Sequence, residues 1–184
     1  KICIFTNTGQ LHTVKLQDVP FGKFRDKGVP IDNISNYDSQ KEYAITVESQ
    51  TSLNLYRILF VTAQAMMKIV DGGEFDVAKR TVAATKLQDN DEVISVEIIR
   101  EQKQVILQSA EGYFLRFGLE EVPEKKKSAV GVRGMKLSDK DHVEAVYYTL
   151  AAMPDPDIVY KDKHVELQRI KPQHRDSKGT KLRL

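Results

Sequence analysis

The residues of this chain with the clearest capacity for chemistry are basic, and they fall at repeated positions in loops. The best-defined of these loops ends in the string Gly131-Val132-Arg133-Gly134-Met135-Lys136-Leu137. Ammonium and guanidinium groups spaced along several loops suit a polyanion, because each can neutralise one phosphate of a phosphodiester chain. Lys68 and Arg116, near expected hairpin tips, are weaker candidates. The main candidate binding residues are Lys23, Arg25 and Lys27; Lys79, Arg80 and Lys86; Lys125, Lys126, Lys127, Arg133 and Lys136; and Arg175, Lys178 and Lys181.

Charge is distributed unevenly, although the formal net charge of the chain is only +2. Residues 161–184 carry eight Lys/Arg against three Asp/Glu, and residues 121–136 carry five against two. Local basic segments on a nearly neutral body favour a track for a polyanion over general adhesion to acidic surfaces. The alternative for either segment taken alone is a solvated charged loop.

Other site chemistries have little support. The four histidines have no partners at metal-ligand spacing, and the single Cys3 can build neither a zinc site nor an internal disulfide. The acidic strings at 89–92 and 139–141 lack the rest of a calcium loop and precede expected strands, so we interpret them as turns. The string Asp71-Gly72-Gly73 is not a phosphate loop, and no nucleophile–base–acid set can be assembled. We therefore expect no metal, no cofactor and no catalytic residue.

The bulk composition is typical of a soluble globular chain, with 184 residues, 41% of them hydrophobic and 29% charged. No apolar run approaches the ~20 residues that span a bilayer. The first residues, Lys-Ile-Cys-Ile-Phe-Thr-Asn, do not resemble a secretory signal, and they lack an initiator Met, so we expect a piece of a longer protein. A lone cysteine fits the reducing cytoplasm.

Internal repetition organises the chain. Leu87 to Val93 and Leu137 to Val143 lie 50 residues apart and share Leu, Asp, Asp and Val at the same offsets. Val82 to Lys86 likewise stands where Val132 to Lys136 stands. With weaker copies at both ends, the repeats predict units at about 1–50, 57–100, 104–150 and 157–184 within one domain, 1–184. A period near 50 residues points to a propeller-like or solenoid array.

The local pattern is that of strands. Short runs of alternating apolar and polar residues predict strands at 43–47, 93–99, 104–109, 112–117, 143–149 and 165–170. Tight polar turns at 7–9, 110–112 and 161–163 predict hairpins, and 48–56 and 151–157 are the best linkers between units. A short helix is compatible with the loops at 21–24 and 71–74. Four strands per unit make a propeller blade, so the fold class is all-β.

Three of these strings together resemble a known family. They are the hairpin Gly112-Tyr113-Phe114-Leu115-Arg116, the segment Gly131 to Leu137, and Asp141-x-Val143. They are similar to the repeated motifs of the C-terminal domain of the A subunit of bacterial type IIA topoisomerases, which include DNA gyrase and topoisomerase IV (whose A subunit is ParC). The resemblance covers nearly the whole chain but is sharp only between about 104 and 146. Phe60 to Val96 matches more loosely, with Ala65 where glycine is usual.

The resemblance implies a fold and a function. The fold would be a β-pinwheel, a disc of four-stranded blades with strands exchanged between neighbours, present here as about four repeat units. Its basic rim would bind and bend duplex DNA and feed a segment to the cleavage core. The catalytic tyrosine of the family lies in another domain, so this chain would be non-catalytic, and we interpret Tyr113, Tyr147 and Tyr148 as packing residues.

The same resemblance implies partners. They are double-stranded DNA, the remainder of the A subunit, and the B subunit, which together form an A2B2 holoenzyme, with no membrane and a location at the nucleoid in the cytoplasm. The domain itself would need no cofactor, and the parent enzyme would use ATP and Mg through other domains.

One departure bears on which member of the family this is. Gyrase A subunits carry a Gln-Arg-Arg-Gly-Gly-Lys-Gly box, and the nearest strings here are Phe24 to Gly28 and Asp176 to Gly179, neither of which is that box. Either a box-bearing blade lies upstream of Lys1, or the protein is of the topoisomerase IV type. About four units also falls short of the six blades typical of gyrase, so we favour topoisomerase IV. The rival from another class is a β-propeller scaffold that binds proteins and whose basic loops are incidental.

Overall fold

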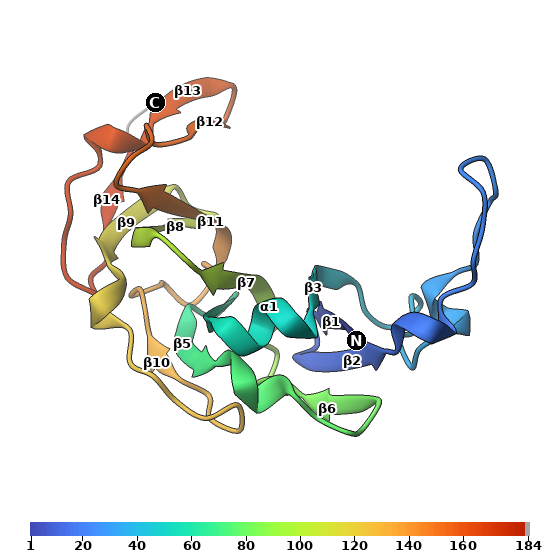
Figure 1. The fold of residues 1–184 in the computed structure, drawn as a ribbon. Coiled ribbons are helices and arrows are strands. Elements are labelled where there is room, and N and C mark those ends of the chain that lie inside the picture. The colour runs from blue at the N-terminus through green and yellow to red at the C-terminus, as the bar shows by residue number, and fades with distance from the viewer. Residues whose placement is uncertain (183–184) are drawn as a thin grey trace.

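The computed structural model describes residues 1–182 and consists almost entirely of strands and loops (Figure 1). The strands are β1 (Ile2–Thr6), β2 (Gln10–Val14), β3 (Ala44–Ser49), β4 (Arg57–Thr62), β5 (Met66–Asp71), β6 (Thr81–Ala83), β7 (Val93–Ile99), β8 (Gln102–Ser109), β9 (Tyr113–Gly118), β10 (Val132–Arg133), β11 (Val143–Leu150), β12 (Asp157–Tyr160), β13 (Lys163–Glu166) and β14 (Thr180–Lys181). The helical segments are α1 (Gln50–Leu55) and the 3₁₀ turns η1 (Leu16–Asp18), η2 (Ile31–Asn33), η3 (Gly72–Phe75), η4 (Leu119–Glu121) and η5 (Leu167–Arg169).

The strands form three four-stranded antiparallel sheets and one hairpin. Their orders are β3-β1-β2-β6 in sheet 1, β7-β4-β5-β10 in sheet 2, β11-β8-β9-β14 in sheet 3 and β12-β13 in sheet 4. The outermost strand of each four-stranded sheet comes from the next unit along the chain. In sheet 1 this strand is β6, which lies between β5 and β7 in sequence but pairs with β2. β10 and β14 join sheets 2 and 3 in the same way. This strand exchange confirms the all-β pinwheel expected from the resemblance.

The register supports the repeat alignment made from the sequence. Val82 pairs with Leu11 in sheet 1, and Val132 pairs with Met67 in sheet 2, so the two valines occupy the same position in successive sheets. Thr180, paired with Phe114, is their counterpart in sheet 3. The division into four units at the boundaries given above stays a prediction.

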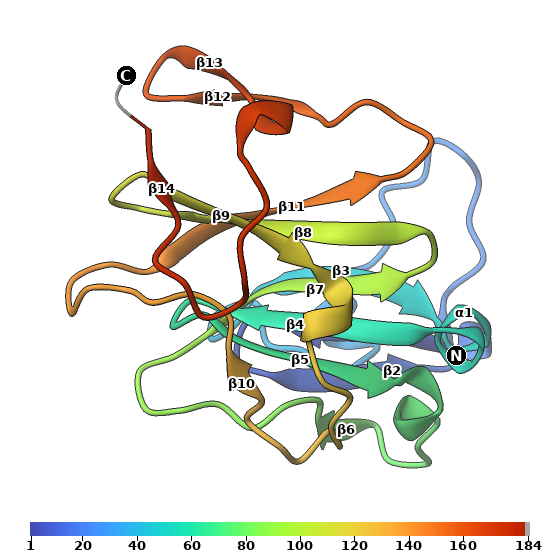
Figure 2. The same ribbon diagram turned by 90° about the vertical axis from the view of Figure 1, so that its left-hand side faces the viewer.

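The sheets follow one another along a curved row, and their faces stack (Figures 1 and 2). Three apolar clusters fill the spaces between sheets 1 and 2, sheets 2 and 3, and sheets 3 and 4. In the first of them, Phe5 packs edge-on against Phe60 and Phe75, with ring centroids 5.8 and 5.2 Å apart. Each sheet is therefore held by its neighbours rather than by a single central core.

Strand β4 shows why alternation is an incomplete guide to this fold. Ile58 and Phe60 enter the cluster shared with sheet 1, while Leu59 and Val61 enter the cluster shared with sheet 3. A strand buried on both faces is a continuous apolar run, and the alternation that predicted other strands did not indicate this one.

One local expectation was wrong. The predicted strand over 165–170 ends at Glu166, because Leu167 and Ile170 are both buried while the two residues between them are exposed. That spacing of three fits η5, since a 3₁₀ turn has three residues per turn. The expected linker at 48–56 does connect β3 of sheet 1 to β4 of sheet 2, and it contains α1. The N-terminus of α1 is capped by the Ser49 hydroxyl, which accepts from the backbone N–H of Ser52 at 3.1 Å. The loop at 71–74 does hold a helical turn, η3, whereas 21–24 holds no helix.

The hairpin turns are as the sequence predicted, and they also join neighbouring sheets. Gly9 and Gly112 have φ of +76° and +86°, and Ala65 takes the same conformation at +62°. The turn of sheet 1 accepts a hydrogen bond from the next inner strand, Val93 N–H to Asn7 C=O at 2.8 Å. The turn of sheet 2 does the same for β11, through Ala63 C=O. Among residues 1–182, no helix has the length and apolar character to cross a membrane.

Candidate nucleic-acid interface

The exchanged strands lie on the convex side of the row of sheets. Figure 1 shows β6, β10 and β14 at the outside, whereas β3, β7 and β11 face inward, and β7 contacts both of the other two. We call β6, β10 and β14, with the loops 76–92, 119–142 and 167–179 around them, the outer edge. Strand exchange therefore brings one basic loop from each of three successive units to the same side of the molecule.

The first candidate set lies apart from the outer edge. Lys23, Arg25 and Lys27 are exposed on a loop that projects away from sheet 1, shown in blue in Figure 1. A turn in which the Asp26 carboxylate accepts from the Lys23 N–H at 2.6 Å shapes its tip. These three residues are accessible, but the structure does not bring them together with the other sets.

The third and fourth sets lie side by side. The Arg175 guanidinium donates to the backbone carbonyl of Arg133 at 2.7 Å and to that of Glu121 at 2.9 Å. Lys136 N–H donates to Ser177 C=O at 2.9 Å, which ties the segment after β10 to the loop before β14. Arg133 itself forms a two-point ion pair with Asp176, in which the shorter contact is 2.5 Å. Two basic loops thus form one continuous surface.

The second and third sets are also adjacent. The Thr85 hydroxyl, next to Lys86, donates to the Ala129 carbonyl at 3.5 Å. On η3, Glu74 pairs with Lys126 at 3.2 Å, and its backbone carbonyl accepts from Lys127 Nζ at 3.0 Å. The structure therefore assembles three of the four candidate sets along the outer edge.

The members of these sets differ in how far their charge is already engaged. The side chains of Arg80, Lys127, Arg133 and Arg175 each donate to protein acceptors. Within residues 1–182, the side-chain ammonium groups of a second group make neither a hydrogen bond nor an ion pair, and they are available to a phosphate. That group comprises Lys79, Lys86, Lys125 and Lys136.

Tyr113 has a role that the sequence did not reveal. Its ring packs partly against the cluster between sheets 2 and 3, as expected of a packing residue. The same ring lies under two candidate ammonium groups, with Lys178 Nζ 4.7 Å and Lys181 Nζ 5.2 Å from its centroid. Cation–π contacts of this kind hold both lysines at the outer edge. The spacing of aromatic and basic residues across two units gave no signal of it.

The two weaker candidates do not belong to the surface. Arg116 is half-buried and binds Asp155 at 2.8 Å and Gln104 at 2.6 Å. Lys68 is fully buried, and its Nζ donates to three backbone carbonyls. Neither hairpin tip presents these side chains to solvent, because both residues lie within strands that are covered by a neighbouring unit.

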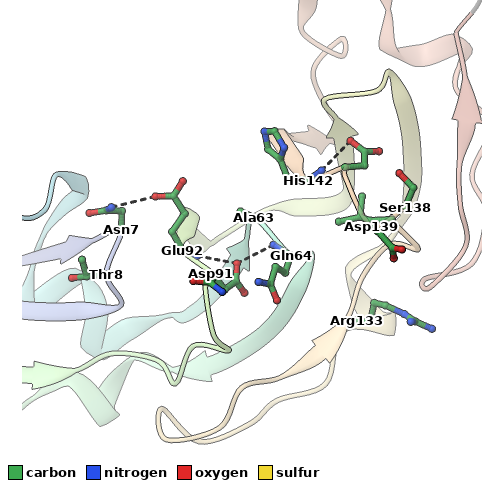
Figure 3. A pocket seen from close by; sticks show the side chains of 13 residues that line it. Asn7, Thr8, Ala63, Gln64, Asp91, Glu92, Arg133, Ser138, Asp139 and His142 are labelled. Atoms are coloured by element: carbon green, nitrogen blue, oxygen red, sulfur yellow. Dashed lines mark hydrogen bonds between the residues drawn. The ribbon is translucent and has the colours of Figure 1, made fainter.

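A hollow of about 820 Å³ lies where the hairpin turns of successive sheets meet (Figure 3). Its lining includes Asp91, Glu92, Asp139 and Asp141 beside the single basic Arg133, so it repels phosphate. Asp91 and Asp141 are turn residues, as the sequence predicted: Asp91 accepts from Gln64 N–H at 2.9 Å, and Asp141 accepts from Glu111 N–H at 3.0 Å. Over residues 1–182, no group of three or more His, Cys, Asp or Glu could hold a metal ion.

Comparison with known proteins then decides the family. The family model described as "DNA gyrase C-terminal domain, beta-propeller" matches residues 1–39, 56–100 and 103–149, which is most of the chain. The chain belongs to this family. The resemblance noted in the sequence is thereby confirmed.

Curated relatives agree with the family match. The chain is 31% identical over 146 residues to the DNA gyrase A subunit of Lawsonia intracellularis, which is 78% of this chain and 18% of that protein. It is 29% identical over 143 residues to the DNA gyrase A subunit of Klebsiella oxytoca, covering 77% of this chain and 16% of the relative. The chain thus spans less than a fifth of the length of these relatives.

Solved structures share the fold of this chain. The C-terminal domain of DNA topoisomerase IV superposes with a TM-score of 0.82 at 24% identity, covering 97% of this chain and 57% of that one. The E. coli ParC C-terminal domain superposes with a TM-score of 0.78 at 15% identity, covering 99% of this chain and 76% of that one. A DNA gyrase A C-terminal domain superposes with a TM-score of 0.74 at 24% identity, covering 97% of this chain and 58% of that one. Since gyrase and topoisomerase IV structures both match, the fold does not separate the two.

Proposed function

We propose that this chain binds and bends duplex DNA along its outer edge, and so presents a DNA segment to the cleavage core of a type IIA topoisomerase. The observation that carries the proposal is the convergence of three basic loops, one per exchanged strand, on the convex side of the row of sheets (Figure 1). The chain would be a non-catalytic part of an ATP-dependent isomerase.

Electrostatics supplies the physical basis. Duplex DNA carries a dense line of phosphates, and each phosphate that a lysine neutralises releases condensed counterions. Contacts to the backbone position the duplex without reading its sequence. Lys79, Lys86, Lys125 and Lys136 are exposed and unengaged within residues 1–182, and they come from two successive units. A row of such contacts along a curved edge stabilises a curved path of the duplex.

The wider assembly belongs to the same proposal. Partners would be double-stranded DNA, the remainder of the A subunit, and the B subunit, in an A2B2 holoenzyme at the nucleoid, while ATP and Mg would act through other domains. A topoisomerase IV type is favoured over gyrase by the lack of the Gln-Arg-Arg-Gly-Gly-Lys-Gly box in residues 1–184. The test is whether the holoenzyme introduces negative supercoils with ATP, which a gyrase does, or only relaxes and unlinks DNA.

The decisive experiment is duplex binding across a salt series. We expect the wild type to contact about four to eight phosphates, so that log K falls with log salt with a slope of about −4 to −7. A variant with Lys125, Lys126, Lys127 and Arg133 all changed to Glu should lose at least ~100-fold in affinity at moderate salt, with a shallower slope.

The matched control carries the same change in net charge elsewhere. Lys41, Lys103, Lys161 and Lys163 are exposed and lie outside the outer edge, and changing all four to Glu should cost much less affinity. Equal losses in both variants would show attraction by net charge alone. No binding by the wild type near physiological salt would instead favour the alternative, a scaffold that binds proteins.

A further inference from the structure

A fully buried lysine lies directly beneath the most basic loop of the outer edge. Lys68, on β5, has 0% exposure. Its Nζ donates to the backbone carbonyls of Lys126 at 3.0 Å, Lys127 at 2.8 Å and Ala129 at 2.6 Å. An ammonium has three donors and no acceptor. All three donors are therefore satisfied by one short segment, which is the segment that carries three consecutive lysines.

The loop is closed around this ammonium. Where the loop begins, Ile69 N–H donates to Pro123 C=O at 3.1 Å, and Lys125 N–H donates back to Ile69 C=O at 2.8 Å. Ala129 N–H donates to Lys126 C=O at 3.0 Å, which makes the turn. Because the carbonyls of 126, 127 and 129 converge on Lys68, the loop between Pro123 and β10 has one defined path.

The charge state of Lys68 fits this arrangement. Burial lowers the pKa of Lys68 to about 8, and the nearby carboxylate of Glu74 raises it in part. The three carbonyl oxygens and the Phe60 ring, whose centroid is 5.7 Å from Nζ, also favour the charged form. The charged groups facing this site are Glu74 on η3, which favours the ammonium, and the lysines of the loop itself, which oppose it. With a pKa of about 8, Lys68 is mostly protonated at neutral pH. A buried charge of this kind is stable only with its partners in place.

The equivalent positions in sheets 1 and 3 hold no lysine that binds a covering loop. The strand register identifies the positions equivalent to Lys68. Lys68 directly follows the β5 residue that pairs with β10, and the residues that follow the corresponding pairs are His12 on β2 and Leu115 on β9. His12 bonds to the Thr81 hydroxyl at 2.8 Å and to Glu42 at 2.6 Å, and Leu115 is apolar. The lysine therefore occurs in the one sheet whose covering loop holds three consecutive lysines.

Resting on the proposed function, we propose that Lys68 is a positioning residue for DNA binding: its ammonium gathers the carbonyls of 126, 127 and 129 and so fixes the lysines of loop 123–131 at the outer edge. Lys68 never touches DNA in this scheme. It acts by holding the backbone in one path, so that the loop lysines do not have to be ordered when the duplex arrives.

The first test compares Lys68→Met with wild type. Met keeps the buried stem but removes the three donors. We expect backbone amides of 125–131 to exchange hydrogen at least ~10-fold faster while the strand amides stay protected. We expect duplex affinity at low salt to fall ~5- to 30-fold and the salt slope to lose about one to two phosphates. Lys103→Met, which removes one exposed charge elsewhere, should change affinity less than ~2-fold.

Combining Lys68→Met with substitutions of the loop lysines separates a positioning role from a general loss of structure. In a chain already carrying Lys125→Ala, Lys126→Ala and Lys127→Ala, adding Lys68→Met should have no further effect on DNA affinity, because the side chains it positions are gone. An undiminished further loss would mean that Lys68 acts through the fold as a whole and would overturn the proposal.

A second variant covers the case in which Lys68→Met fails to fold. Two glycines inserted after Lys127 keep Lys68 and every loop lysine but let the segment leave the ammonium. We expect the same loss of affinity and of amide protection, and wild-type affinity in this variant would overturn the proposal. Absence of DNA binding by the wild type would overturn the proposed function and with it the DNA role of Lys68, whereas the exchange data would still decide whether Lys68 orders the loop.

Discussion

At the scale of single residues, the outer edge contains cations that are free and cations that are already paired. Lys125 and Lys136 have no partner within residues 1–182, whereas Arg133 is held by Asp176 in a two-point contact. The hydrogen bond from Arg133 lowers the pKa of Asp176, so that carboxylate stays ionised below the usual range of an aspartate. Acidification therefore releases Arg133 only at a lower pH than an unpaired aspartate would require.

Removing the carboxylate should release it. Asp176→Asn abolishes the charge that competes with phosphate for Arg133, and Asn suits the φ of +66° at this position. We expect duplex affinity to rise ~3- to 10-fold at low salt, with about one more phosphate in the salt slope. Asp157→Asn, at an exposed site on β12, removes the same charge without freeing a cation of the outer edge. Equal gains from both changes would argue against a specific role for the Arg133–Asp176 pair.

At the scale of elements, the exchanged strands depend on very close contact between backbones. Gly131, which precedes β10, has a φ of +104°, and a Cβ there would lie 2.3 Å from the backbone oxygen of Met67. Gly179 precedes β14 in the same conformation, and its Cβ would lie 2.6 Å from the Phe114 oxygen. The glycine is needed both for its conformation and for the approach of the two chains.

A pair of identical substitutions separates these two requirements. Gly28 also has a positive φ, +74°, but nothing lies within 4 Å of where its Cβ would be. We expect Gly28→Ala to cost about 1 kcal/mol of unfolding free energy or less, from conformation alone. Gly131→Ala should cost at least ~3 kcal/mol, because β10 must separate from β5. Urea denaturation measures both, and similar costs would contradict the contact argument.

Particular elements show how much the sequence could predict. The exchange of strands was expected only through the family resemblance, which rests in part on the motif from Gly131 to Leu137. The predicted turns at 7–9 and 110–112 are confirmed, since positive φ restricts residue choice. Strand β4 was missed because both of its faces are buried. The partners of the basic residues were beyond reach: that Lys68 is buried and Lys125 is free depends on contacts between units, which spacing within one unit does not encode.

At the scale of the whole molecule, the sheets form an arc whose convex side carries the basic loops (Figure 1). The acidic hollow of Figure 3 lies where the hairpin turns meet, beside Arg133 of the outer edge, so a polyanion is attracted to the basic loops but repelled at this hollow. With a net charge of only +2, the chain has little long-range field with which to force a duplex around the entire molecule.

We therefore expect a modest bend rather than a full wrap. A duplex of about 40 base pairs with a fluorophore at each end should show a small rise in energy transfer on binding, which the four-fold Glu variant of the outer edge abolishes. A topology assay in which this chain alone traps strong positive writhe in plasmid DNA would contradict the expectation.

The exchanged strands also determine how such a protein can change in length. The units at 57–100, 104–150 and 157–184 each donate their third strand, which is β6, β10 or β14, to the preceding sheet. A tandem duplication of one ~50-residue unit would therefore add one complete sheet, and every junction would repeat a pairing that already exists. Neither an unpaired edge nor a new kind of interface would arise, so unit number can drift during evolution while the chemistry of the surface is copied along with it.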